Sequence, residues 1–287
     1  MAILSQIIIP GFLLGGIFAL VSVGLSLQYG TARVLNIAHG EFIMIGAFIT
    51  FWLLGSVNLN PLVSLVVSTP VVFVLGWLLH STLFRRLMDT SPTLDVFEGK
   101  SMLASFGLLY VVQNIARMIW GSEPHNIQFM NNSVTSAQIP LNRLVALGVV
   151  IVIGVIFYFF LARTRLGKAI RASAQDPTTA GLMGVNIHRV LAICFGLGLA
   201  MAGIAGTLIS TLLSIDTAMG LQYTVIAMIV VVLGGLGSIT GAMIGGVVLG
   251  LVSALVTYYQ PSWTNIAYYV IFVVLLLSRP KGIMGKA

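Results

Sequence analysis

Long apolar segments separated by short polar ones are the feature that most constrains the fold of this chain. Of its 287 residues, 58% are hydrophobic and 7% are charged, and the mean hydropathy is +1.06. Soluble domains carry about a quarter charged residues, so this chain cannot expose a solvated surface on every side. An apolar run of about 20 residues can cross a bilayer as a helix. The sequence predicts an all-α, polytopic transmembrane helical bundle that forms one domain over residues 1–287.

We expect eight or nine membrane spans and favour nine. The predicted spans are 7–28, 40–55, 62–83, 102–120, 144–161, 190–213, 223–233, 242–258 and 266–278. The second and seventh are short, and either could re-enter the membrane instead of crossing it. No Lys or Arg precedes the first apolar run, which argues for a retained span and against a cleaved signal peptide. The single cysteine, Cys194, excludes an intrachain disulfide.

Positive charge predicts the orientation of these spans. The longest charged interruption, residues 163–189, carries five cations and one acid, Asp176. If this segment is cytoplasmic, all 14 Lys and Arg residues except Arg117 and Arg143 lie on the cytoplasmic side, as the positive-inside rule requires. These cations are Arg163, Arg165, Lys168, Arg171 and Arg189 in the segment, with Arg33, Arg85, Arg86, Lys100, Arg279, Lys281 and Lys286 elsewhere. The N-terminus and the polar loop 122–138 are then outside, and the C-terminus is cytoplasmic. The net charge of +7 indicates contact with anionic lipid headgroups and not binding to nucleic acid.

Small residues recur at a spacing of four in the apolar segments, which lets helix backbones approach closely. Gly198, Ala202 and Gly206 follow this pattern, and a second set comprises Gly237, Gly241, Gly245, Gly246 and Gly250. We favour packing within one chain, with a contact between two copies as the alternative. The four glycines of residues 234–241 predict a turn between two spans.

The sequence lacks the motifs of an enzyme. His39, His80, His125 and His188 make no metal-binding pattern, and the chain has no Walker-type glycine loop and no nucleophile elbow. We therefore expect a non-catalytic protein that binds no metal or cofactor. Glu41 is the one acid expected within the hydrocarbon, near a cytoplasmic helix end. Coupling to an ion through buried carboxylates is thus disfavoured, and active transport would need another energy source.

The cytoplasmic segment 163–189 suits a soluble partner. Asp176 and Pro177 form a cap and a first turn for a short helix over residues 177–183, which Gly184 would end. A short helix-turn-helix with small residues and a polar rim can dock into a groove. The alternative is a helix that lies on the lipid headgroups. The break at residues 175–177 disfavours a simple surface helix.

Four segments together resemble the LivH-like permease subunits of high-affinity branched-chain amino acid ABC importers, to which urea and amide permeases are close. They are GGIFALVSVGLSLQYGTARVLNIAHGEFIMIGAF (15–48), RASAQDPTTAGLMGVNIHRV (171–190), LGGLGSITGAMIGGVVLG (233–250) and RPKGIMG (279–285). The resemblance covers nearly the whole chain. It implies a bacterial or archaeal cytoplasmic (inner) membrane and an importer that includes a homologous second permease subunit. It also implies two cytoplasmic ATPase subunits, which bind ATP and Mg, and an extracytoplasmic substrate-binding protein.

The same resemblance implies that residues 171–186 couple the permease to the ATPases. The expected coupling residues are Arg171, Ala174, Gln175, Asp176, Pro177, Ala180 and Gly184. Gln175 departs from the family, where an acid often stands. The mechanism implied is alternating access driven by closure of the ATPase pair.

The run from Asn36 to Glu41 has two interpretations. Asn36 can cap the second span, with Glu41 in its first turns where an acid complements the helix dipole. Alternatively, Asn36, His39 and Glu41 form a cytoplasmic gate. The translocation path should be lined by uncharged polar groups, for which the candidates are Ser22, Ser26, Gln28, Gln113, Asn114, Ser210 and Thr211. Each of these could equally bond between helices.

The substrate expected from the resemblance is a branched-chain or other small amino acid. Urea, short amides or aromatic acids are the alternatives within the family. From other classes, a stand-alone facilitative carrier or channel would transport without a docking partner, and a structural membrane subunit would show no flux.

Overall fold

The structure is a computed structural model that describes residues 2–127, 129–130, 133–134, 139–279 and 282–284. Lys281, Lys286 and part of the predicted loop 122–138 lie outside the described residues. The helices are α1 (Ala2–Ala32), α2 (His39–Val57), α3 (Pro61–Leu79), α4 (Arg85–Asp89), α5 (Leu94–Trp120), α6 (Leu141–Arg163), α7 (Arg165–Gln175), α8 (Pro177–Leu182), α9 (Ile187–Ser210), α10 (Met219–Gly234), α11 (Ile239–Tyr259) and α12 (Thr264–Ser278). Two-residue strands, β1 (Ser133–Val134) and β2 (Ile139–Pro140), pair antiparallel before α6.

Eight stretches of helix in the described part of the chain are long and apolar enough to cross a membrane. One of them, Pro61–Asp89, joins α3 to α4 through a π-helical turn at His80–Phe84. The predicted seventh span is present as α10, which has 16 residues and is shorter than the others. The predicted eight or nine spans thus correspond to eight long apolar stretches and the shorter α10.

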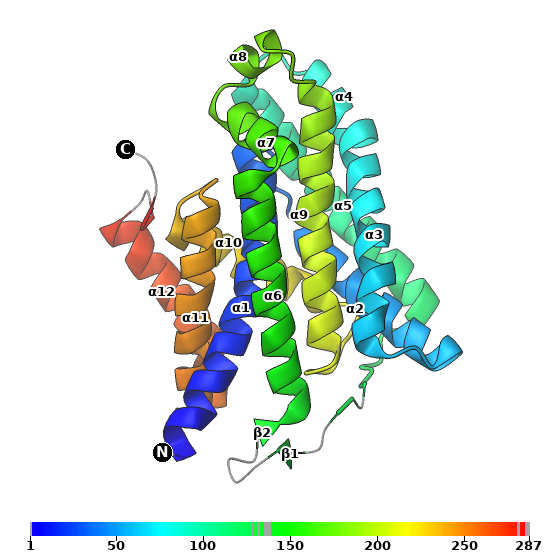
Figure 1. The fold of residues 1–287 in the computed structure, drawn as a ribbon, viewed down its shortest axis with the longest axis vertical. Helices are drawn as coiled ribbons and strands as arrows, with labels where there is room; N and C mark the ends of the chain where they lie inside the picture. Colours follow the sequence, from blue (N-terminus) through cyan, green and yellow to red (C-terminus); the bar gives the residue numbers. More distant parts are fainter. Residues whose placement is uncertain (1, 128, 131–132, 135–138, 280–281, 285–287) are drawn as a thin grey trace.

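The start of α1 and the segment 163–189 lie at opposite ends of the bundle. Figure 1 shows the start of α1 at the bottom and α7 and α8 at the top. The end of α10 reaches the α8 side as well, because a Cβ built on Gly30, near the end of α1, would lie 3.1 Å from Gly237 just after α10. Opposite ends are what the predicted orientation requires. Which end faces the cytoplasm stays a prediction.

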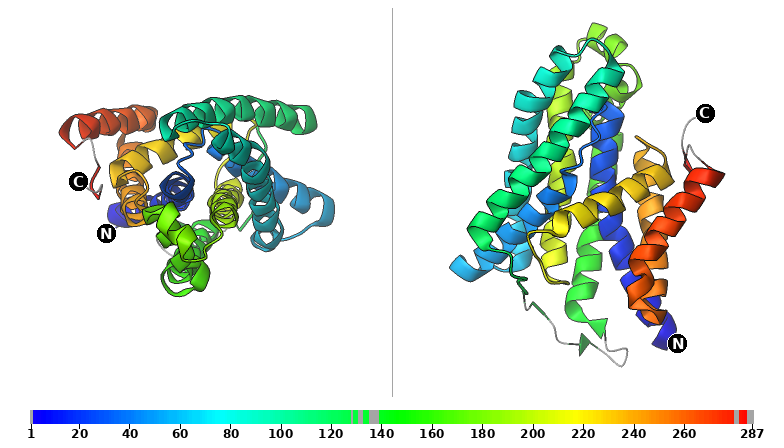
Figure 2. Two further views of the ribbon diagram at one scale, coloured as in Figure 1. Left: turned by 90° about the horizontal axis from the view of Figure 1, so that it is seen from above. Right: turned by 180° about the vertical axis from the view of Figure 1, so that it is seen from behind.

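Helices α1 and α9 form the centre of the molecule, with the other helices around them (Figure 2, left). In α9, 89% of the most apolar stretch is buried. In the stretch Pro261–Ser278, which contains α12, only 6% is buried. Glycine permits this enclosure: a Cβ on Gly206 would lie 1.9 Å from the Ile43 carbonyl oxygen, and one on Gly24 would lie 2.3 Å from that of Gly198. Close backbone approach is how helices associate in lipid.

The glycines predicted to pack helices contact other parts of the same chain. The Cβ positions built on them face Gly234 for Gly241, Leu233 for Gly245, Ala19 for Gly246 and Gly15 for Gly250. Gly237 faces Gly30 of α1 and lies before α11 with φ +79°, in the turn predicted for residues 234–241. A positive φ favours glycine, since it has no Cβ to clash.

Candidate functional site

Helix α2 begins deep inside the bundle and not at its end. After α1 ends at Ala32, the backbone of Arg33 takes φ +54° and residues 33–38 turn back into the protein. His39, the first residue of α2, places Nε2 3.1 Å from the carbonyl oxygen of Val21. Val21 stands eleven residues before the end of α1, which is about 16 Å at the rise of an α-helix. Glu41 thus lies near a helix end, as predicted, but this end is inside the bundle.

Side chains from two other helices, α5 and α10, hold the non-helical segment 33–38 and the start of α2. Ser105 of α5 accepts a hydrogen bond from Ile37 N at 3.1 Å. Thr224 Oγ1 of α10 accepts from Gly40 N at 2.8 Å and donates to Ile37 O at 3.0 Å. Irregular backbone at membrane depth is tolerated where protein supplies its hydrogen bonds. Because Ser105 and Thr224 lie far from this segment in sequence, sequence reasoning missed both.

Asn36 does not cap α2, contrary to one of the two predictions. The residue at the N-cap position is Ala38, and α2 has no side-chain cap. Asn36 instead accepts from Ala38 N at 3.1 Å and donates from Nδ2 to Gln28 Oε1 at 3.4 Å. Gln28 in turn donates to Phe195 O of α9 at 3.3 Å. Asn36 and Gln28 therefore form one buried chain of hydrogen bonds between α1, the segment 33–38 and α9.

The N-terminal ends of α2 and α10 meet at this depth, and α10 runs obliquely across the bundle (Figure 2, right). A Cβ on Gly40 would lie 1.9 Å from Gly220 O, and one on Gly220 would lie 2.4 Å from Oε1 of Glu41. The Glu41 carboxyl thus rests against the second residue of α10. The glycines at positions 40 and 220 permit this contact, and neither was predicted from the sequence.

Several buried polar atoms at this junction have no hydrogen-bond partner within the described residues. They are both carboxyl oxygens of Glu41, Nδ1 of His39 and the hydroxyls of Ser22 and Ser26, all in side chains with no exposed surface. Arg117 of α5 is the charged residue that interacts electrostatically with Glu41. Buried polar groups are normally paired, so such a cluster is typical of a functional site. We call the region of Gly40, Glu41 and Gly220 the α2–α10 junction.

The other residues predicted to line the path are dispersed. Gln113 is buried on α5, whereas Asn114 is exposed and donates to Tyr110 O within its own helix. Ser210 and Thr211, at the far end of α9, donate to the carbonyl oxygens of Thr207 and Leu208. The structure therefore brings Ser22, Ser26 and Gln28 near the junction through α1 and leaves these four apart from it.

The segment 163–189 is held to the bundle at the α6–α7 turn by a cap and by hydrogen bonds of Arg171. Thr164 caps α7 by accepting from Gly167 N at 3.0 Å. Arg171 donates to the carbonyl oxygens of Leu161 and Ala162, the last turn of α6. A cation at this place satisfies free carbonyl groups and complements the helix dipole. Arg171 thus positions α7 against α6.

Helix α8 is formed as the sequence predicts. Asp176 accepts from the backbone N–H groups of Thr178 and Thr179, at 2.9 Å and 3.2 Å, and from the Thr179 hydroxyl. These hydrogen bonds, that of the hydroxyl above all, lower the pKa of the Asp176 carboxyl. Gly184, with φ +87°, follows the helix end. The predicted helix is one residue longer than the observed Pro177–Leu182.

The outer surface of this segment combines polar and apolar side chains. Ala180 is buried, but Ala174, Gln175, Asp176 and Pro177 are exposed. At the end of α8, Leu182 and Met183 are 84% and 82% exposed. We call Leu182 and Met183 the apolar tip. Helix α8, which ends in this tip, lies at the top end of the molecule in Figure 1.

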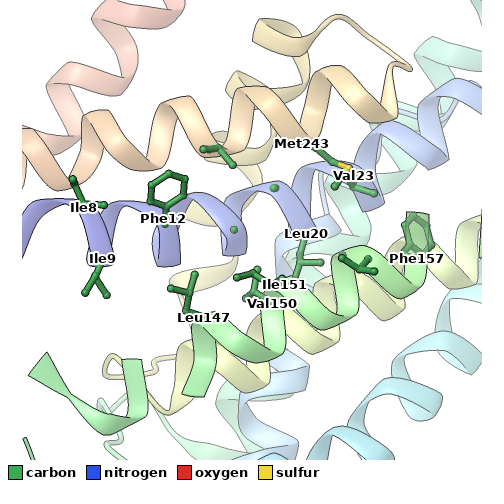
Figure 3. Close-up of a pocket in the computed structure, with 15 residues that line it drawn as sticks. Ile8, Ile9, Phe12, Leu20, Val23, Leu147, Val150, Ile151, Phe157 and Met243 are labelled. Carbon is green, nitrogen blue, oxygen red and sulfur yellow. The ribbon is translucent and has the colours of Figure 1, made fainter. Parts of the chain in front are cut away.

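A groove elsewhere in the bundle is apolar. It has a volume of about 360 Å³ and is lined by α1, α6 and α11, with Phe12, Val150 and Met243 among its walls (Figure 3). None of its lining residues has a polar side chain. It offers no side-chain donor or acceptor to a polar solute. In the described part of the chain, no group of three or more His, Cys, Asp or Glu residues could hold a metal ion.

Comparison with known proteins gives the family. The family described as "Branched-chain amino acid transport system / permease component" matches residues 7–278. The high-affinity branched-chain amino acid transport system permease protein LivH of Escherichia coli K12 is 28% identical over 294 residues, covering 96% of this chain and 94% of that protein. The corresponding protein BraD of Pseudomonas aeruginosa is 28% identical, with 98% and 95% covered. A probable LivH permease of Methanocaldococcus jannaschii is also 28% identical, with 98% and 93% covered.

These findings agree with the resemblance seen in the four sequence segments. The apolar helices and the permease relatives make the chain a multi-pass protein of the cytoplasmic membrane. Its role is that of an ABC-type permease subunit. The chain belongs to the family of branched-chain amino acid transport system permease components.

Proposed function

We propose that this chain and a homologous second permease form the translocation path of an importer for branched-chain or other small amino acids. An extracytoplasmic binding protein delivers the substrate, and two ATPases dock on the cytoplasmic end. ATP and Mg are bound by those ATPases, and this chain binds no cofactor. Support comes from the branched-chain amino acid permeases of both bacteria and archaea that it resembles along nearly its full length.

We propose that residues 163–189, which we call the coupling segment, bind the ATPases. Its apolar tip, Leu182 and Met183, is exposed, and α8 lies at one end of the bundle (Figure 1). Exposed apolar side chains on a short helix suit insertion into a groove of a soluble partner. The caps at Thr164 and Asp176 fix α7 and α8, so that a displacement of the docked partner moves the segment as a unit.

Alternating access follows from this arrangement. ATP binding closes the ATPase pair, the coupling segments move with it, and the two permeases rock to change which face is open. The α2–α10 junction is an internal contact that such rocking can open. Glu41 at this junction, with His39 at the start of α2 and Asn36 in the segment before it, is therefore proposed as an internal gate between the ends of α2 and α10.

The proposal is tested by extracting the tagged chain from native membranes in mild detergent and identifying the bound proteins by mass spectrometry. We expect two Walker-motif ATPases and a second permease. Leu182→Glu should remove the ATPases and retain the second permease, while Leu213→Glu, an exposed apolar position on the outer side, should retain both. Recovery of the chain alone, in an extract that preserves a known ABC importer, would contradict the proposal.

Flux measurements separate the rival functions. Replacing residues 171–184 by a neutral linker should abolish uptake by an ABC importer but leave that of a stand-alone carrier or channel intact. Uptake of urea, short amides or aromatic acids in place of leucine, isoleucine or valine would identify one of the related permeases.

A further inference from the structure

The α2–α10 junction places an acid where a helix begins, in the interior of the bundle. The chain has seven Asp and Glu residues, and Glu41 is the one with no exposed surface. Its two carboxyl oxygens have no hydrogen-bond partner among the described residues, and they lie against Gly220 in the first turn of α10. Helix α10 begins without a side-chain cap. A buried acid and an uncapped helix N-terminus are therefore in direct contact.

These two groups have opposite preferences for charge. The N-terminus of a helix attracts anions through its free N–H groups and its dipole. A buried carboxylate attracts a cation, because burial without a partner is costly. In the present contact, the Glu41 carboxyl takes the place that an anion would have at α10. Arg117 is the cation that interacts with Glu41 electrostatically, but it forms no salt bridge with it among the described residues.

We propose that the α2–α10 junction binds the head group of a zwitterionic α-amino acid during transport. The substrate ammonium group pairs with Glu41, and the substrate carboxylate replaces Glu41 at the N-terminus of α10. Inserting the zwitterion between the two groups satisfies both and adds no net charge to the interior. This inference rests on the proposed import of amino acids and assigns the groups that recognise the substrate within the permease.

The junction is built so that it can open. Gly40 and Gly220 let the backbones of α2 and α10 approach closely, and the Thr224 side chain bonds across the contact. The segment 33–38 ahead of α2 is not helical, and its hydrogen bonds to Ser105 and Thr224 come from single side chains. A few backbone rotations there would displace the start of α2 and uncover Glu41. Urea and uncharged amides lack the two charges, so the junction favours amino acids over them.

The first experiment compares uptake and ATP hydrolysis by the complete importer in vesicles, with L-leucine and its binding protein. Glu41→Gln should reduce leucine uptake at least about tenfold, while ATP hydrolysis stimulated by the loaded binding protein stays within about twofold of the unmodified complex. Glu123→Gln, which removes an exposed acid in the outer loop, should leave both unchanged. Absence of amino acid uptake by the unmodified complex would contradict the proposed function. Unchanged uptake by Glu41→Gln would contradict this inference and the gate role of Glu41, but not the proposed import of amino acids.

A binding measurement separates recognition from a structural role. The purified permease–ATPase complex is titrated with L-leucine and with 4-methylpentanoic acid, which has the same carboxylate and side chain but no ammonium group. The unmodified complex should bind leucine at least about tenfold more tightly, and Glu41→Gln should lose this preference. If Glu41→Gln does not assemble, Glu41→Asp, which keeps the charge, should retain a reduced preference. Equal binding of both compounds by the unmodified complex would overturn the inference, as would a full preference in Glu41→Gln.

Discussion

At Gly40, a single hydrogen atom in place of a side chain determines whether α2 and α10 can meet. Gly40→Ala would place a Cβ 1.9 Å from the carbonyl oxygen of Gly220, a backbone atom that cannot rotate away. We expect a loss of about 1–3 kcal/mol of stability, the usual cost of overpacking a well-packed interior. Thermal unfolding of the purified chain in detergent measures this. Gly99→Ala has no atom within 4 Å of its Cβ and is the control. An equal Tm for the two variants would show that the junction does not pack this closely.

Thr224 supplies the hydrogen bonds that join α10 to the start of α2. Thr224→Val keeps the shape of the side chain but removes the hydroxyl that bonds Gly40 N and Ile37 O. Leaving these buried groups unpaired should cost about 1–3 kcal/mol, and Thr224→Ser should restore most of it. The comparison is made by chemical or thermal unfolding. Thr82→Val, at an exposed position where the hydroxyl bonds its own helix, should change stability little. Equal effects at both positions would argue against a special role for Thr224.

Among the elements, α8 depends on one short-range cap. Asp176→Ala removes the acceptor for the N–H groups of Thr178 and Thr179 and should loosen the first turn of α8. We expect weaker stimulation of ATP hydrolysis by the loaded binding protein, with normal assembly in the membrane. Asp176→Asn, which keeps an oxygen acceptor, should retain most of the stimulation. A response of Asp176→Ala equal to that of the unmodified complex would mean that α8 is fixed by its docked partner instead.

The lowered pKa of Asp176 sets the sign of its pH dependence. Because the folded state favours the ionised carboxylate, the cap contributes fully above the ordinary pKa of an aspartate. It is lost only as the pH falls through the lowered value. Asp176 should therefore stay ionised between about pH 6 and pH 8, because this whole range lies above the titration of an aspartate. The stimulation of ATP hydrolysis should then vary with pH in the same way in the unmodified complex and in Asp176→Asn. A loss of stimulation in this pH range that depends on Asp176 would contradict the assignment of the ionised Asp176 carboxylate as the cap of α8.

The contrast between α8 and α2 shows what sequence can predict. Helix α8 follows from neighbouring residues: Asp176 caps it, Pro177 begins it and Gly184 ends it, and the structure has all three. The start of α2 depends on Ser105 and Thr224, which are distant in sequence, so the local sequence suggests a cap at Asn36, one of its two interpretations, that the structure does not form. The lengths of the apolar runs predicted most spans, because these lengths also depend only on neighbouring residues. Sequence reasoning placed Glu41 within the hydrocarbon near a helix end but could not show that this end lies deep inside the bundle, because that depth follows from a reversal of the chain at Arg33.

For the whole molecule, the charge distribution predicts that the α8 end is cytoplasmic, and chemical labelling can test this. The chain has one cysteine, Cys194, which is fully buried, so the unmodified protein should react little with a maleimide. Ser122→Cys follows α5 on one side of the bundle, and Thr90→Cys precedes it on the other; both positions are exposed. In intact cells, a membrane-impermeant maleimide should label Ser122→Cys, whereas Thr90→Cys should need permeabilisation. The reverse pattern would place α7 and α8 outside, beyond the reach of any cytoplasmic ATPase, and would refute the proposed coupling as well as the orientation.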